Sequence, residues 1–424
     1  MGQQMKINSR KTNLVSASGI YVAANIINSL IPFALLPVLT RYLSPSEYGE
    51  VAVYQVWIAM IASVCGFSVH GAALRKYYDD TKGEMAEFIS SCIFLLIISS
   101  IIVIGIVSLI GGTIYTLIGI NSQWLLLGVL TASAGFVIQL RLGQWQVRNQ
   151  PINFGTLQVT MSIVNMLLSV FLVVILSQGT EGRVMGISAT ACLFSIISLI
   201  LLRLDGLLLF VWRKDLIIEA LKFGIPLLPH VLGSFLLLSI DKVVISHQLG
   251  LEYAGYYMVA AQLAMVLGIL LEGINKAYTP WLYDTLAKDN YSEKVKIVKL
   301  TYYFAFFLSV CVALTFAIGD KVLIFIAGEQ YSKSVSIIGW LVLAKAFHGM
   351  YFMSCGYIFY KKETLLISKI TLVSGAINLV LLFILLEKYG ILGAAWAMCL
   401  GMFVQWILTW VTASRLVQMP WRLR

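Results

Sequence analysis

Residues 88–140 read FISSCIFLLIISSIIVIGIVSLIGGTIYTLIGINSQWLLLGVLTASAGFVIQL, a run of 53 residues without a charged side chain. A helix needs about 20 apolar residues to cross a bilayer, so this run is too long for one crossing and fits two. We expect the two helices to be joined through turn-like residues at Gly111–Thr113 and Gly119–Ser122. The stretch therefore predicts a membrane protein with closely spaced helices.

The rest of the chain has the same character. Of its 424 residues 59% are hydrophobic and 12% are charged, whereas a soluble domain carries about 25% charged residues. Long charge-free runs predict helices rather than strands, because the alternating ten-residue segments of a membrane barrel are absent. The twelve predicted spans are 14–40, 49–74, 87–110, 123–146, 154–177, 183–204, 220–247, 252–280, 297–319, 334–360, 364–386 and 390–415. The sequence thus predicts an all-α polytopic membrane protein.

The net charge of +10 raises the question of nucleic-acid binding, and the position of the charges argues against it. With the N-terminus inside, most Lys and Arg residues fall in inner loops or at the termini. The five assigned to outer loops are Arg41, Arg183, Lys321, Lys333 and Lys388. This asymmetry is the positive-inside pattern, and it predicts that both termini are cytoplasmic. The six cysteines all lie in apolar spans without metal-ligand spacing, which predicts packing residues and no metal site.

The two halves of the chain resemble each other. Leu43, Gly49 and Val53 coincide with Leu249, Gly255 and Val259 at an offset of 206 residues, and the end of each half repeats Gly, Cys and Leu at an offset of 207. We therefore predict two six-helix bundles, 1–206 and 207–424. Six spans separate the halves, so they have the same orientation and form a parallel repeat. Transporters of this design place the substrate path between the halves.

Two stretches also resemble a known family. Ala17–Tyr21 and Pro37–Gly49 are similar to the opening of the Wzx-type O-antigen and polysaccharide unit flippases. In the second half, Phe223–Pro229, the pair Asp241 and Lys242, and Gly255–Tyr257 resemble the family's seventh and eighth spans. These flippases belong to the multidrug/oligosaccharidyl-lipid/polysaccharide exporter superfamily, whose MATE-like fold the resemblance implies.

The resemblance implies a function as well. It suggests a flippase that moves an oligosaccharide unit on undecaprenyl pyrophosphate from the cytoplasmic to the periplasmic leaflet of the bacterial inner membrane by alternating access. The implied partners are this lipid-linked glycan, membrane lipids, and the polysaccharide polymerase with its chain-length regulator. It implies no enzymatic activity. Flippases for the peptidoglycan precursor are also similar, but they usually have fourteen spans.

Charged residues inside spans are costly and usually face a cavity or a partner. Lys345 lies near the middle of the tenth span, and His348 follows three residues later on the same helical face. In one interpretation Lys345 attracts pyrophosphate or an acidic sugar. In the other, it is paired for purely structural reasons.

Arg141 lies late in the fourth span and forms a polar stripe with Gln139, Gln144 and Arg148 near the cytoplasmic side. Arginine suits phosphate because its planar fork donates two parallel hydrogen bonds. We therefore predict a substrate-binding role for Arg141, with an interfacial anchor as the alternative. Arg75, at the inner end of the second span, has the same two interpretations, and the positive-inside pattern favours the anchor there.

Four further charges are predicted to act in gating or coupling. Asp241 and Lys242 lie near the outer end of the seventh span, and neighbours in sequence point apart on a helix, so they need not pair. Glu272 and Lys276 are spaced i, i+4 in the eighth span, which permits a salt bridge. A self-neutralising pair and a protonatable coupling carboxylate both remain open for Glu272.

The energy source and the alternatives follow from what the sequence lacks. It has no phosphate-binding Gly-rich loop, so we expect no ATP hydrolysis and no cofactor. A proton or sodium gradient, the membrane potential, or consumption of the product outside could drive transport. The leading alternative is a cation-coupled multidrug exporter of the same fold. An O-antigen polymerase is disfavoured by the short outer loops, and a channel by the absence of a filter-like loop or charged rings.

Overall fold

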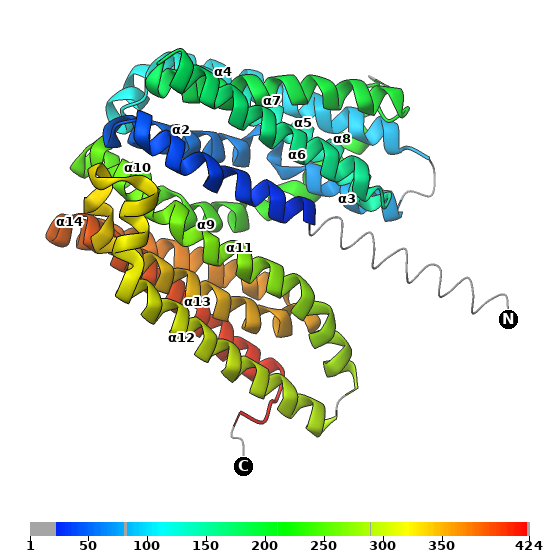
Figure 1. The fold of residues 1–424 in the computed structure, drawn as a ribbon. Helices are drawn as coiled ribbons and strands as arrows, with labels where there is room; N and C mark the ends of the chain where they lie inside the picture. The colour runs from blue at the N-terminus through cyan, green and yellow to red at the C-terminus, as the bar shows by residue number, and fades with distance from the viewer. Residues whose placement is uncertain (1–22, 80–82, 210, 289, 422–424) are drawn as a thin grey trace. The chain divides into compact units, whose positions relative to one another are not determined.

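The computed structural model describes residues 23–79, 83–209, 211–288 and 290–421, and every regular element within them is a helix (Figure 1). The predicted all-α class is confirmed for this part of the chain. The start of the first predicted span, 14–22, and the basic residues Lys6, Arg10 and Lys11 lie outside the described residues.

The helices follow one another with short connections. The first runs from Ala23 to Tyr42. The helices of the first part are α2 (Pro45–Val64), η1 (Cys65–Ser68), α3 (His70–Asp79), α4 (Met85–Ile118), α5 (Ser122–Val147), α6 (Pro151–Val170), η2 (Phe171–Ile175) and α7 (Gly179–Leu204). They are followed by α8 (Lys214–Gly224), η3 (Ile225–Leu227), α9 (Leu228–Leu238), α10 (Ile240–Leu249), α11 (Leu251–Ala287), α12 (Tyr291–Ala327), η4 (Glu329–Ser334), α13 (Val335–Tyr360) and α14 (Thr364–Leu416).

Ten of the described helices are long and apolar enough to cross a membrane. Counting the bent pair Lys214–Leu227 and Val231–Leu238 as one span gives eleven. The chain is therefore a multi-pass membrane protein. The sequence predicted twelve spans, and the remaining difference is α14, which was predicted as two spans.

The boundary between α4 and α5 lies where one of the two turn signals predicted it. Gly119 adopts a left-handed conformation (φ 74°) and ends α4, and the Asn121 side chain caps α5 by accepting from the Gln123 N–H at 3.1 Å. The prediction of a turn at Gly111–Thr113 is wrong, because these residues lie within α4. In an apolar environment a helix satisfies the backbone polar groups, so two glycines do not end it.

The long helix α14 changes direction near its middle. Gly390 has φ 58° and ψ −144°, a conformation that only glycine adopts readily. A Cβ atom on Gly393 would overlap with the carbonyl oxygen of Leu385. Eight residues of a straight helix span about 12 Å, so this contact requires the chain to fold back. The two arms of α14 coincide with the predicted spans 364–386 and 390–415.

Two other predicted spans are broken. The span 49–74 contains η1, where Gly66, Phe67 and Ser68 all have positive φ, and the Gly66 N–H donates to Ser99 Oγ on α4 at 2.9 Å. The span 220–247 is divided into α8, η3, α9 and α10. Pro226 lies in η3, where it removes a backbone donor from the helix.

The chain forms two compact units that do not follow the order of the sequence. Unit 1 consists of the chain up to Leu43 together with Val53–Leu228, and unit 2 consists of Ser44–Ala52 together with the chain from Pro229 onward. These units are defined by contacts and not by the repeat. The predicted halves 1–206 and 207–424 therefore stay a prediction.

In unit 1, α5 packs against both α4 and α7, and α6 packs against α7 (Figure 1). The buried Tyr54 hydroxyl lies 2.6 Å from Ser188 Oγ on α7 and 3.2 Å from Thr131 Oγ1 on α5. Lys76 Nζ on α3 is 2.9 Å from a carboxylate oxygen of Glu219 on α8. These contacts fasten α2, α3 and α8 to the same bundle.

In unit 2 the helices α11 to α14 surround an apolar core, and the first turns of α2 pack on α11. A Cβ on Gly49 would overlap with the Leu251 carbonyl oxygen, and a Cβ on Gly255 would overlap with the Pro45 carbonyl oxygen. Pro45 and Gly49 are each 206 residues before Leu251 and Gly255. This reciprocal contact is what a local two-fold relation between the repeats would produce.

Candidate functional site

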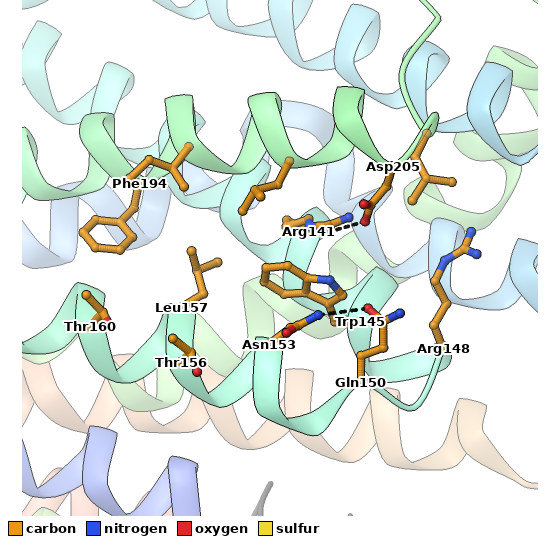
Figure 2. Close-up of a pocket in the computed structure, with 13 residues that line it drawn as sticks. Arg141, Trp145, Arg148, Gln150, Asn153, Thr156, Leu157, Thr160, Phe194 and Asp205 are labelled. Carbon is orange, nitrogen blue, oxygen red and sulfur yellow. Dashed lines mark hydrogen bonds and ion pairs between the residues drawn. The ribbon is translucent and has the colours of Figure 1, made fainter.

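A pocket of about 690 Å³ lies in unit 1 between α5, α6 and α7. It is found where α5 ends, α6 begins and α7 ends, and Figure 2 shows its wall. The lining residues are Arg141, Trp145, Arg148, Gln150, Asn153, Thr156, Leu157, Thr160, Phe194, Ile197, Leu201, Asp205 and Leu207. The charged residues thus gather at one end of the pocket, and the other end is mixed, with Phe194 and Leu157 beside Thr156 and Thr160 (Figure 2).

The local sequence explains why the helix ends meet here. Asn149 turns the chain with a positive φ of 55°, and the Gln150 N–H donates to the Trp145 carbonyl oxygen at 2.8 Å. Pro151 then starts α6, where its fixed φ suits the first helical position. Gly206 (φ 68°) turns the chain away after α7 and leaves Asp205 at the edge of the pocket.

Arg141 is the central residue of the charged end. Its side chain is 2% exposed and forms an ion pair with Asp205, whose side chain is 47% exposed. The guanidinium carbon lies 4.0 Å from the ring centroid of Trp145, one helical turn further along α5. Within the described residues, Arg141 Nε and Nη1 have no hydrogen-bond partner. Two buried donors without a partner are costly, so an anion that reached them would be stabilised in addition to the pairing with Asp205.

Neighbouring polar groups widen this charged end. Arg148 lies over the Tyr77 ring at 5.2 Å, and its Nε finds no partner among the described residues. Asn153 Nδ2 donates to Gln150 Oε1 at 3.4 Å, and both side chains are exposed (Figure 2). With two guanidinium groups and one carboxylate, the charged end is net positive. It offers fork-shaped donors to a phosphate or a carboxylate.

The structure places Arg141 and Arg148 in this pocket, but it separates them from the other members of the predicted stripe. Gln144 on α5 is buried against α3, and its Nε2 donates to the Ala73 carbonyl oxygen at 3.4 Å. Gln139 is exposed. Arg75 does not line the pocket, because its side chain is 70% exposed and pairs with Asp79 on the same helix at 3.1 Å.

Lys345 and His348 lie on α13 in unit 2. Lys345 is 8% exposed, and its side chain packs beside Gly268 on α11, where a Cβ would lie 3.7 Å from the Lys345 Cδ. No ion pair joins Lys345 to another side chain in the part of the chain that the structure describes. The His348 ring stacks on Tyr351 at 5.4 Å and meets the edge of Phe352 at 4.5 Å.

Asp241 and Lys242, which need not pair by their positions on a helix, do form an ion pair in the structure. Lys242 Nζ is 3.0 Å from Asp241 Oδ1, and the Lys242 N–H donates to the same oxygen at 2.9 Å. A break at Ser239 puts Asp241 in the first turn of α10, where its side chain can fold back on the backbone. Asp241 Oδ2 is buried without a partner among the described residues.

Glu272 and Lys276 are both exposed on α11. No ion pair connects them in the described segments, so the spacing that permits a salt bridge does not produce one here. Their predicted role in coupling stays a prediction.

Sequence reasoning missed Trp145 and Asp205. Trp145 was treated as part of an apolar span, although the i, i+4 spacing from Arg141 is a signal for stacking on one helical face. Asp205 follows the predicted span 183–204, in a loop where a charge is ordinary. Its contact with Arg141 joins residues 64 positions apart. No local pattern in the sequence predicts that contact.

Comparison with known families and proteins extends these observations. The family described as "Polysaccharide biosynthesis protein" matches residues 14–286. A membrane protein of Haemophilus influenzae is 24% identical over 382 residues, covering 87% of this chain and 89% of that protein. The "Succinoglycan biosynthesis transport protein ExoT" of Rhizobium meliloti is 21% identical over 326 residues, covering 74% of this chain and 63% of that protein.

Solved structures show the same fold. The lipid II flippase MurJ in an inward closed conformation has a TM-score of 0.77 and 14% identity, covering 92% of this chain and 87% of that chain. An inward-facing multidrug resistance MATE family transporter has a TM-score of 0.68 and 13% identity, covering 93% and 97%. The predicted MATE-like fold is thereby confirmed.

Proposed function

Because the chain belongs to the polysaccharide biosynthesis protein family, a family of transporters and not of enzymes, we propose that it exports a lipid-linked glycan. The proposed substrate is an oligosaccharide repeat unit on undecaprenyl pyrophosphate. The proposed activity is its transfer from the cytoplasmic to the periplasmic leaflet by alternating access. The named transport function of the succinoglycan relative supports this class of substrate.

The single observation that carries the proposal is the Arg141 pocket. Arg141 lines the pocket and has two buried donors, Nε and Nη1, that lack a partner among the described residues and that phosphate oxygens of a pyrophosphate group could satisfy; Arg148 adds a second positive charge. The apolar side chains of the pocket, among them Phe194 and Leu157, suit the lipid next to that group. A soluble cationic substrate would be repelled from the same wall.

The proposed location is the bacterial inner membrane with both termini in the cytoplasm. The positive-inside pattern supports this orientation, in which the Arg141 pocket would lie at the cytoplasmic end of unit 1. We also propose twelve spans, because the two arms of α14 that meet near Gly390 add one to the eleven counted with the bent pair. An even number of spans agrees with two cytoplasmic termini.

Unit 2 supplies the other proposed substrate contacts. Lys345, with its neighbour His348, is proposed to attract an anionic headgroup or an acidic sugar, since a buried ammonium without an ion pair is costly to keep. The pair Asp241 and Lys242 is proposed to act in gating, and Glu272 in ion coupling. A polysaccharide polymerase and a chain-length regulator are the proposed protein partners.

A cation-coupled multidrug exporter is the second candidate. The buried Asp241 Oδ2 without a partner favours it, because a carboxylate in an apolar site attracts a cation. The fold is shared with a multidrug transporter as well as with a flippase. The cationic pocket in unit 1 is the observation against it.

A strain deleted for the chain separates the two candidates. For glycan export we expect loss of surface polysaccharide, with lipid-linked units stranded on the cytoplasmic face, and recovery when the gene is returned. Normal surface polysaccharide together with increased sensitivity to cationic drugs would reject glycan export and favour the multidrug exporter. Measuring both in the same strain makes the two outcomes directly comparable.

A further inference from the structure

The ion pair between Arg141 and Asp205 is strongly asymmetric. Three features restrict the Arg141 side chain. It is buried, it packs on the Trp145 ring, and its backbone lies within α5. Asp205 is nearly half exposed at the pocket edge and follows the last residue of α7. Since the cation is fixed and the anion is not, Asp205 is the partner that can leave.

Little else holds the Asp205 carboxylate. Among the described residues its only ion pair is the one with Arg141. The Asp205 N–H donates to the Leu201 carbonyl oxygen at 3.1 Å, so the backbone stays in place when the side chain rotates. The Asp205 side chain is 47% exposed, so there is space for that rotation.

The atom that Asp205 contacts is decisive. Asp205 accepts from Nη2, while Nε and Nη1 are buried without a partner among the described residues. A guanidinium offers two forks of parallel donors, Nε with Nη2 and Nη1 with Nη2, and each of the two Nη2 hydrogens belongs to one fork. Asp205 therefore occupies one fork as long as it stays. Once it leaves, that fork can receive two oxygens of one phosphate group.

We propose that Asp205 is an exchangeable counter-ion of Arg141. Singly charged phosphodiesters do not displace it and therefore do not bind in the pocket, whereas a lipid-linked diphosphate displaces it and binds. This inference rests on the proposed function, because it names what the pocket selects. A cationic pocket at a membrane surface meets phospholipid headgroups in large excess. A monoanion gains little by exchanging for a carboxylate, whereas a diphosphate carries more charge and can also engage Arg148.

The test uses the purified full-length protein and three probes: inorganic pyrophosphate, farnesyl diphosphate and short-chain phosphatidylglycerol. The variant is Asp205→Asn, which keeps the shape and removes the charge. The control is Asp79→Asn, which removes a carboxylate from an exposed arginine pair outside the pocket. Asp205→Ala is a second variant, and a thermal melt of each protein confirms that it is folded.

We expect wild-type protein to bind both diphosphates and not phosphatidylglycerol. The Asp205→Asn variant should bind the diphosphates roughly tenfold more tightly than wild type, because one charge-assisted hydrogen bond to Arg141 no longer has to be broken before they bind. The same variant should gain binding of phosphatidylglycerol, and Asp79→Asn should match wild type. If farnesyl diphosphate binds at least as tightly as pyrophosphate, the pocket recognises the lipid-linked form of the diphosphate.

Three results would overturn the proposal. The first is unchanged or weaker diphosphate binding in both Asp205 variants, which would mean that Asp205 positions Arg141. The second is continued exclusion of phosphatidylglycerol by Asp205→Asn. The third is binding of pyrophosphate with exclusion of farnesyl diphosphate, which would assign the pocket to a soluble anion. If any of these occurs while the deletion strain still loses its surface polysaccharide, the proposed function stands and only this inference fails.

Discussion

Substitution of Gly186 by alanine should weaken the packing of α6 against α7. A Cβ at this position would lie 2.5 Å from Ser169 Oγ and 3.2 Å from Ser169 Cα, which is too close for real atoms. Ser169 Oγ accepts a hydrogen bond from Arg183 Nη1 at 2.5 Å, and Asn165 Oδ1 accepts from the same nitrogen at 2.9 Å. The methyl group must therefore push the helices apart or move Ser169 away from Arg183.

The magnitude follows from two terms. Overpacking costs about 1–3 kcal/mol, and a hydrogen bond between membrane helices contributes about 0.6 kcal/mol on average and up to about 1.7. We expect Gly186→Ala to lower the free energy of unfolding by roughly 2–4 kcal/mol. Thermal or detergent unfolding of the purified protein measures this loss.

A matched control is available on α4. Gly105 has no heavy atom within 4 Å of a Cβ position, so Gly105→Ala should be neutral or slightly stabilising. Adding Ser169→Ala to Gly186→Ala removes the clashing oxygen, so the double variant should lose less than the sum of the single losses. Wild-type stability in Gly186→Ala, or strictly additive effects, would refute this account of the packing.

Three further predictions concern transport. Arg141→Lys keeps the charge but loses the fork, so the affinity for pyrophosphate should fall roughly tenfold in a binding titration; an unchanged affinity would argue against bidentate binding. Lys345→Ala should reduce surface polysaccharide in the deletion strain at equal protein levels, while Lys345→Arg should retain most of it; full export by the alanine variant would reject the cation's role. If Glu272 couples transport to protons, wild-type transport should respond to a pH gradient and Glu272→Gln should not, and the same response in both would remove that role.

Helix placement could be predicted well because lipid makes charge costly. The charge-free run 88–140 therefore located α4 and α5, and Gly119 with Asn121 located their boundary. The break at η1 could not be predicted in the same way. Phe67 and Ser68 are held at positive φ in a segment where Gly66 bonds to Ser99, 33 residues away, and such a contact leaves no local pattern.

The candidate site was predicted only in part, for a related reason. Arg141 stood out because it is a charge inside a span. Its counter-ion Asp205 lies outside the spans, where a charge is ordinary, and only the packing of α5 against α7 brings the two together. The pairing of Asp241 with Lys242 was missed because it depends on the helix break at Ser239.

The exchange of short segments between the two compact units has a consequence for how the protein is made. Ser44–Ala52 is synthesised early but packs in unit 2, which otherwise starts at Pro229. At about 5–20 residues per second a ribosome needs roughly ten seconds or longer to cover that distance. Similarly, α8 completes unit 1 although it follows the halfway point of the chain. Neither unit can therefore fold completely before the ribosome has passed the middle of the message. We expect the protein to be inserted in one continuous process and to fold poorly when the chain is divided at residue 206.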